Sequence, residues 1–122
     1  MQLASLIINV EGKKTGQVAL YPSSETLLGR SSECTVVLED DRASRKHATV
    51  FFRDGQWFVR DLKSRNGTVL GSQLIHGAVP LQHGDTIWIG HSEVTFQLLD
   101  DEQASPDDTK NTGSNVDVVE GA

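Results

Sequence analysis

The chain has 122 residues, which is the size of one ordinary domain. Its formal net charge of −6 is carried by residues 100–122, which hold seven of the 17 acidic side chains and one of the 11 basic ones. Residues 1–99 are therefore neutral, and they lack the excess of cations that argues for binding to duplex nucleic acid.

The first part of the chain contains short runs of the residue types and the period of two that strands favour. Residues 3–10 form one such run and residues 17–21 the next, and we expect the segment 11–16 to be the turn between them. Two shorter runs follow at residues 26–28 and 35–38. These patterns predict four strands.

Two hairpins are predicted further along. Residues 48–53 and 56–60 are rich in β-formers and flank Asp54-Gly55, a dipeptide that strongly favours a two-residue hairpin turn. Residues 86–89 and 93–98 flank a second turn of the sequence Gly-His-Ser. Many short strands separated by turns, with no helical pattern, indicate an all-β antiparallel sandwich or barrel.

The expected core consists of the large apolar residues of these runs. Their number is sufficient for an independent core in about 100 residues. They are Leu6, Ile8, Val18, Leu20, Leu28, Val37, Val50, Phe52, Trp57, Val59, Ile87, Ile89, Val94, Phe96 and Leu98.

After Leu99 the composition changes. Residues 100–122 contain no aromatic residue and are rich in Asp, Ser, Asn, Thr and Gly. Such a segment cannot bury enough apolar surface to offset its ordering entropy, so we expect a disordered acidic tail or linker after a domain at residues 1–99.

Three polar clusters lie at expected turns: Gly29-Arg30, Ser44-Arg45-Lys46-His47 and Ser64-Arg65-Asn66-Gly67-Thr68. Arginine provides a permanent charge and a planar fork of donors, and Ser and Asn add neutral hydrogen bonds. This combination suits a phosphate group and the peptide backbone beside it.

The order Gly-Arg, Ser-x-x-His, Asn-Gly and then Gly84-Asp85 resembles the forkhead-associated (FHA) domain family over roughly residues 3–99. The resemblance implies an eleven-stranded antiparallel β-sandwich of the FHA/SMAD-like type, whose loops at one end bind phosphothreonine peptides. It also implies a protein–protein interaction module in signalling.

The resemblance implies roles for individual residues. Arg30, Ser44 and Arg45 match positions that contact the phosphate, and Asn66 matches the residue that binds the peptide backbone. Arg65 stands where many family members have Thr, so it is either a second phosphate contact or a contact to an acidic ligand residue. Surface or turn roles are the alternatives for Arg30 and Ser44, and an Asn-Gly turn with positive φ is the alternative for Asn66.

Gly29, His47, Ser64 and Gly67 are expected to support the binding loops. A catalytic or metal-binding role for His47 is rejected, because the other histidines show no ligand spacing and no Gly-x-Ser-x-Gly nucleophile motif is present. We expect no enzyme activity, no metal and no cofactor. Cys34 is the only cysteine, which excludes an intrachain disulfide, and we expect it to be a small buried residue.

The expected partner is a phosphothreonine protein produced by a Ser/Thr kinase, bound with an affinity near the micromolar range, about 8 kcal/mol. No apolar run approaches the roughly 20 residues of a membrane span, and no signal peptide is evident, so we expect a cytoplasmic, monomeric domain without membrane contact. The alternative is a phosphate-independent interaction or assembly domain that uses the same face or the opposite sheet. Thr109 and Thr112 of the tail are possible internal ligands if a kinase modifies them.

Overall fold

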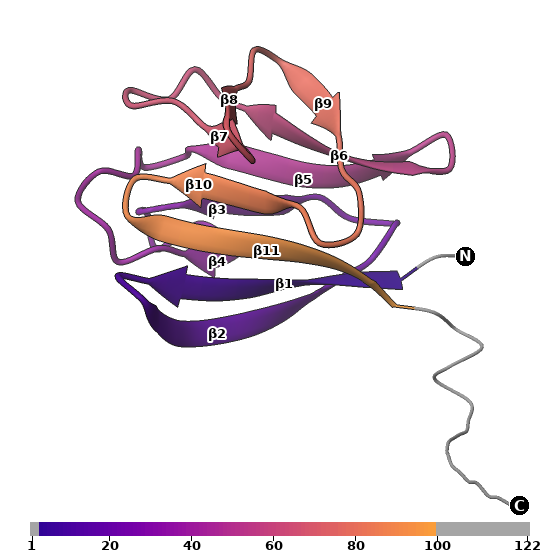
Figure 1. Ribbon diagram of the computed structural model, residues 1–122, viewed down its shortest axis with the longest axis horizontal. Helices are drawn as coiled ribbons and strands as arrows, with labels where there is room; N and C mark the ends of the chain where they lie inside the picture. The colour runs from indigo at the N-terminus through magenta and orange to yellow at the C-terminus, as the bar shows by residue number, and fades with distance from the viewer. Residues whose placement is uncertain (1–2, 100–122) are drawn as a thin grey trace, which may run out of the picture.

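The computed structural model describes residues 3–99, which form two packed β-sheets without a helix (Figure 1). The prediction of an all-β, eleven-stranded sandwich is confirmed. The tail at residues 100–122, with Thr109 and Thr112, lies outside the described residues. The strands are β1 Leu3–Val10, β2 Lys13–Leu20, β3 Thr26–Gly29, β4 Val36–Val37, β5 Ala48–Arg53, β6 Gln56–Asp61, β7 Val69–Leu70, β8 Gln73–Leu74, β9 Ala78–Pro80, β10 Thr86–Ile89 and β11 Ser92–Leu99.

The strands divide into a six-stranded sheet of order β2-β1-β11-β10-β7-β8 and a five-stranded sheet of order β4-β3-β5-β6-β9. All neighbours are antiparallel except β3 and β4, which are parallel. Within residues 3–99 no helix is long and apolar enough to cross a membrane.

Both predicted hairpins are present. Asp54 and Gly55 have φ of 51° and 80° and close the β5–β6 turn, as a two-residue turn with positive φ at both positions requires. The β10–β11 hairpin is closed at Gly90 and His91.

The predicted turn at residues 11–16 is too long. Glu11 and Gly12, with φ of 52° and 82°, close the turn between β1 and β2, so β2 begins at Lys13 and not at residue 17. The pairing then shifts by one residue between Ile8 and Asn9, and Thr15 is the extra residue in this bulge. A bulge hides the period of two, which explains why these residues did not look like a strand.

The core lies between the sheets and is centred on Trp57 and Phe96, whose ring centroids are 6.2 Å apart. Val18, Phe52 and Leu98 are partly buried at its margin. Val37 was predicted to be in the core, but this is wrong, because it is 46% exposed. Val36 and Leu38 point inward in its place, since a shift of one residue in a strand exchanges the two faces.

One end of the sandwich collects the polar loops. The β3–β4, β4–β5 and β6–β7 loops lie there, together with the β1–β2 and β10–β11 turns, at the left in Figure 1. The β5–β6 hairpin turn is at the opposite end. The fold therefore places all three polar clusters of the sequence at one end of the molecule.

Candidate functional site

Backbone hydrogen bonds join the three loops that carry the clusters. The N–H of Arg30 donates to the Ser44 carbonyl at 3.0 Å, and that of Ser31 donates to the Arg45 carbonyl at 3.1 Å. The N–H of Leu62 donates to the His47 carbonyl at 2.9 Å, which connects the third loop to the second. The clusters, separate in sequence, are therefore parts of one hydrogen-bonded unit.

Gly29 lets the first two loops approach each other. A Cβ at this position would overlap the Arg45 carbonyl oxygen and would lie 2.9 Å from the Cys34 sulfur. The Gly29 carbonyl also accepts a hydrogen bond of 2.7 Å from the Leu38 N–H. A side chain would therefore push the loop of Arg30 away from the loop of Ser44 and Arg45.

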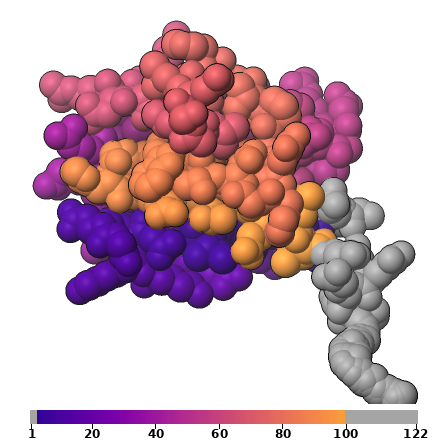
Figure 2. All heavy atoms as spheres, viewed as in Figure 1, coloured from indigo at the N-terminus to yellow at the C-terminus, as the bar shows by residue number. Residues whose placement is uncertain are grey.

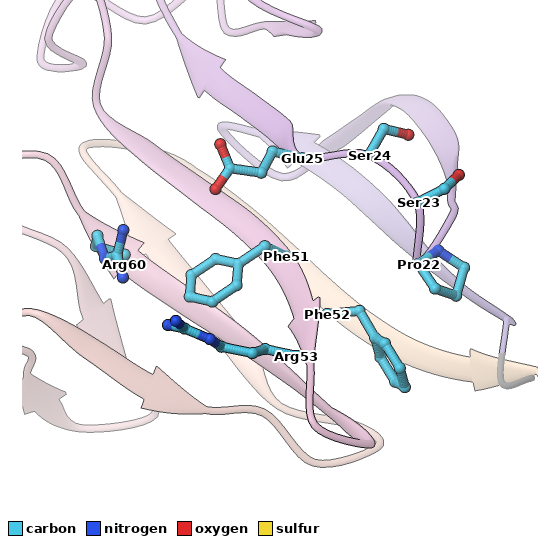
Figure 3. A pocket seen from close by; sticks show the side chains of 8 residues that line it. All are labelled: Pro22, Ser23, Ser24, Glu25, Phe51, Phe52, Arg53 and Arg60. Atoms are coloured by element: carbon cyan, nitrogen blue, oxygen red, sulfur yellow. The ribbon is translucent and has the colours of Figure 1, made fainter.

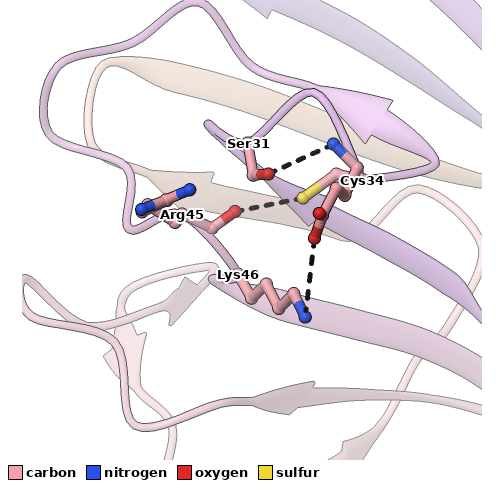
Figure 4. A network of polar contacts seen from close by, with 5 residues as sticks. Ser31, Cys34, Arg45 and Lys46 are labelled. Atoms are coloured by element: carbon pink, nitrogen blue, oxygen red, sulfur yellow. Dashed lines mark hydrogen bonds and ion pairs between the residues drawn. The ribbon is translucent and has the colours of Figure 1, made fainter.

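Cys34 is part of the same contact (Figure 4). Its thiol donates to the Arg45 carbonyl at 3.1 Å, and burial raises the pKa of that thiol above its ordinary value. Nearby, Lys46 and Glu33 form an exposed ion pair at 3.9 Å. The thiol is thus a protonated donor that helps to fix the Arg45 backbone.

The side chain of Arg30 is exposed, and one hydrogen bond to the protein orients it. Its Nε donates to the Ala43 carbonyl at 3.1 Å. Among residues 3–99 no carboxylate lies within ion-pair distance of its guanidinium. Within the part of the chain that the structure describes, the charge is therefore oriented but not neutralised.

His47 is fully buried beneath the loops. Its Nδ1 accepts a hydrogen bond of 2.9 Å from the Ser44 backbone N–H, so the proton of a neutral ring is on Nε2. Nε2 lies 2.9 Å from the Gly67 carbonyl oxygen and donates to it. One ring thereby joins the second loop to the third. Both ring nitrogens are occupied by backbone groups.

The hydroxyl of Ser44 also contacts the third loop. Its oxygen accepts the Arg65 backbone N–H at 2.9 Å. The hydroxyl hydrogen remains able to donate to a ligand. The Arg65 side chain itself is exposed and forms no ion pair within residues 3–99.

Asp61 organises the β6–β7 loop, and the sequence reasoning did not assign it a role. Its carboxylate accepts hydrogen bonds from the backbone N–H and the hydroxyl of Ser64 and, at 2.7 Å, from the hydroxyl of Thr68. Burial raises the pKa of this carboxyl, but the hydrogen bonds from Ser64 and Thr68 outweigh burial and hold it below its ordinary value. The Ser64 hydroxyl in turn accepts the Gly67 N–H at 3.0 Å, so the loop closes on itself.

Asn66 is exposed at the tip of this loop. Its Nδ2 donates to the Arg42 carbonyl at 2.8 Å, which leaves the side-chain oxygen available to accept from a ligand N–H. Asn66 does not have positive φ, whereas Gly67 does, at 86°. The turn therefore needs glycine at position 67, and it does not require Asn at position 66.

A second supporting carboxylate, Asp40, is buried and also was not identified from the sequence. It accepts hydrogen bonds from the N–H of Arg42 at 2.9 Å, the N–H of His91 at 2.7 Å and the hydroxyl of Ser92 at 2.7 Å. Although burial raises the pKa of the Asp40 carboxyl, these hydrogen bonds lower it below its ordinary value. Asp40 thus fastens the β4–β5 loop to the β10–β11 turn. Both aspartates could be recognised only after the loops had been placed.

The arrangement presents an oriented guanidinium, a hydroxyl and an amide on loops that are fixed from below. Arg45 and Arg65 add two exposed cations at the same end. Within residues 3–99 no group of three or more His, Cys, Asp or Glu side chains could hold a metal ion. Such a surface is suited to an anion attached to a hydrogen-bonding chain.

A separate cavity of about 280 Å³ lies on the five-stranded sheet, and its lining includes Phe51, Arg53, Arg60 and Glu25. Figure 3 shows the Phe51 ring between the side chains of Glu25 and Arg53. The Arg60 guanidinium lies 4.9 Å from the Phe51 ring centroid, and Phe51 stacks on Phe58. None of the residues expected to bind a phosphopeptide lines this cavity.

The sequence of this chain matches one family of known domains. A family model described as the FHA domain matches residues 26–90. The FHA domain-containing protein FhaB of Mycobacterium tuberculosis is 35% identical over 94 residues, covering 77% of this chain and 61% of FhaB. This chain therefore spans about three fifths of the length of that relative.

Two solved structures share the fold of this chain. EmbR of Mycobacterium tuberculosis, in complex with a low affinity phosphopeptide, is 31% identical with a TM-score of 0.68, covering 78% of this chain and 24% of that chain. The FHA domain of an Arabidopsis thaliana hypothetical protein is 24% identical with a TM-score of 0.76, covering 84% of this chain and 90% of that chain.

Proposed function

Because this chain belongs to the forkhead-associated (FHA) domain family, we propose that it is a phosphothreonine-dependent protein–protein interaction module. The observation that carries the proposal is the state of Arg30. Its Nε is held by the Ala43 carbonyl, while its charge has no acidic partner among the described residues. A phosphate near neutral pH carries a charge between about −1.5 and −2 and three acceptor oxygens, which such a guanidinium matches.

Each loop contributes to the proposed site. Arg30, the Ser44 hydroxyl and Arg45 bind the phosphate, and Asn66 binds the backbone of the ligand. Arg65 adds a second cation, which contacts either the phosphate or an acidic ligand residue. Gly29, His47, Ser64 and Gly67 hold the loops, as their hydrogen bonds and close contacts support.

A binding role without catalysis is part of the proposal. The His47 ring contacts the backbone N–H of Ser44 and the carbonyl of Gly67, and not the Ser44 hydroxyl. A nucleophile activated by histidine needs the hydroxyl and the ring within hydrogen-bond distance of each other. The buried histidine is better explained as a support for two loops.

The proposal also covers the ligand, the compartment and the extent of the domain. The ligand is a phosphothreonine segment of a partner protein, written by a Ser/Thr kinase and read in the cytoplasm, where ATP is available to kinases. The domain comprises residues 1–99 and acts as a monomer, and residues 100–122 are a tail or linker. EmbR, one of the similar structures, is itself in complex with a phosphopeptide.

The test is an oriented peptide library fixed on phosphothreonine, compared with phosphoserine and unphosphorylated versions by calorimetry. We expect micromolar affinity for the phosphothreonine form and at least about tenfold weaker binding of the unphosphorylated form, because charge-assisted hydrogen bonds contribute about 1.5–3 kcal/mol each. Equal binding of phosphorylated and unphosphorylated peptides would contradict the proposal.

The second candidate is a phosphate-independent interaction on the outer face of the five-stranded sheet. The cavity around Phe51, with the guanidiniums of Arg53 and Arg60 on its lining, favours it. Under this alternative, partner binding survives phosphatase treatment and is lost in Arg60→Gln but not in Arg30→Ala. The opposite pattern supports the phosphothreonine site.

A further inference from the structure

A row of apolar side chains crosses the outer face of the six-stranded sheet. Trp88 of β10 pairs with Val69 of β7, and Val69 pairs with Leu74 of β8. Directly paired residues of neighbouring strands project to the same face of a sheet. Ile87 and Ile89, which flank Trp88, are fully buried, so Trp88 and the other two side chains lie on the outer face.

The row is exposed, and its surroundings are polar. Leu74 is 54% exposed and Trp88 is 40% exposed, whereas Val69 is half-buried between them. The β11 residue opposite Trp88 is Glu93, and Thr95 and Gln97 follow on the same face. Figure 2 views this face, with β10 and β11 in orange and the darker rose segment that includes β7 and β8 above them. Single exposed apolar residues are common, but three on adjacent strands form a patch.

The row begins at the proposed phosphopeptide site. A Cβ on Gly67 would lie 2.6 Å from Leu74 Cδ1, so Leu74 covers the residue that follows Asn66. The β7–β8 hairpin that carries Val69 and Leu74 is held by the bonds from Ile75 N to Thr68 O and from Gly71 N to Thr86 O, both 2.9 Å. The patch is thus continuous with the binding loops and is fixed relative to them.

We infer that Leu74, Val69 and Trp88 form an apolar shelf that binds an apolar side chain of the same phosphothreonine ligand, beyond the residue that Asn66 contacts. The inference rests on the proposed function and adds a sequence preference to it. The shelf crosses two strand spacings of about 4.8 Å each, and an extended peptide advances about 3.3 Å per residue. An apolar residue within about four positions of the phosphothreonine therefore reaches the shelf.

The size of the shelf favours a peptide side chain over a second copy of this chain. It consists of three side chains, of which Leu74 is 54% and Trp88 40% exposed, whereas a stable dimer buries about 800 Å² on each partner. The edge strand β8 has two residues, which is a short template for pairing with another chain. A single apolar side chain of a ligand matches the available surface.

The experiment measures selectivity at each library position for the wild type, Trp88→Thr and Leu74→Gln. The wild type is expected to enrich Leu, Ile, Val, Met or Phe about five- to tenfold at one position on one side of the phosphothreonine. Either variant should reduce that enrichment below about twofold. Tyr21→Ser, which changes a residue that is 56% exposed away from the binding loops, is the matched control and should retain it.

Three results would overturn the inference. Unchanged apolar enrichment in both variants would show that the shelf does not contact the ligand. A dimer in sedimentation velocity that Trp88→Thr converts to monomer would assign the shelf to a second copy. Equal binding of phosphorylated and unphosphorylated peptides would contradict the proposed function and this inference with it. Phosphate-dependent binding with the same apolar enrichment in both variants would contradict the inference alone. Circular dichroism and thermal unfolding verify that each variant is folded.

Discussion

Arg30 derives its proposed role from one hydrogen bond and from the absence of an acidic partner among the described residues. Replacement by alanine removes the charge and the fork of donors, so we expect phosphopeptide affinity to fall by about 50-fold or more. Arg30→Lys should recover part of the loss, because lysine keeps the charge but not the fork. Calorimetry measures the affinities, and circular dichroism verifies the fold.

Arg53→Ala is the matched control, since Arg53 is an exposed arginine that lines the separate cavity and not the loops. It should leave phosphopeptide affinity within twofold of the wild type. If Arg30→Ala binds as tightly as this control, Arg30 is a surface residue and the phosphate is bound elsewhere.

At the residue scale, the sequence singled out the exposed polar residues of the loops but missed two of the side chains that support them. Arg30, Ser44, Arg65 and Asn66 stood out because arginine, serine and asparagine at expected turns suggest an anion site. Asp61 did not stand out. Its carboxylate is recognisable as a support only when Ser64 and Thr68 fold back toward it, and no local pattern encodes that contact.

The end of β3 depends on the close approach of two loops at Gly29. Gly29→Ala should reduce the free energy of unfolding by about 2–3 kcal/mol, because the new methyl group overlaps the Arg45 carbonyl and presses on the Cys34 sulfur. Gly16→Ala is the control, since a Cβ there meets nothing within 4 Å, and its effect should stay within about 0.5 kcal/mol. Urea denaturation measures both. Equal stability of the two variants would mean that the loops adjust freely.

At the element scale, strong local signals predicted the fold and weak ones did not. The Asp54-Gly55 turn fixed the β5–β6 hairpin because both positions need positive φ. The start of β2 was misplaced because the bulge at Thr15 breaks the alternation. The strands β7 and β8 have two residues each, too few for any periodicity, so their pairing depends on the sheet that receives them.

The stability of the whole molecule should depend on acid pH through Asp40 and Asp61. Both carboxyls have pKa values lowered below their ordinary value of 3.8 in the folded protein. Their stabilising contribution is therefore complete above that value and is lost as the pH falls through the lowered pKa, because the unfolded chain binds protons first. Denaturation at several pH values should show the free energy of unfolding decreasing below about pH 4.

Asp61→Asn tests this assignment. The substitution should lower the free energy of unfolding by about 1–3 kcal/mol at pH 7, because hydrogen bonds to a charged carboxylate are lost. It should also make the free energy of unfolding fall less steeply as the pH is lowered below about 4. Asp54→Asn is the control, because Asp54 lies at an exposed turn position that asparagine tolerates. It should change neither the free energy of unfolding at pH 7 nor its dependence on pH. An unaltered acid profile in Asp61→Asn would show that the Asp61 carboxyl does not contribute to the pH dependence.

The most direct measurement of the central claim is a titration of the ¹⁵N-labelled chain with a phosphothreonine peptide and its unphosphorylated form, followed by amide chemical shifts. The phosphorylated peptide should shift the amides of residues 30–31, 44–45 and 65–67 most strongly, and the unphosphorylated peptide should leave them nearly unchanged at the same concentration. Shifts concentrated at Phe51, Phe58 and Arg60, or equal shifts with both peptides, would contradict a phosphothreonine site on the loops.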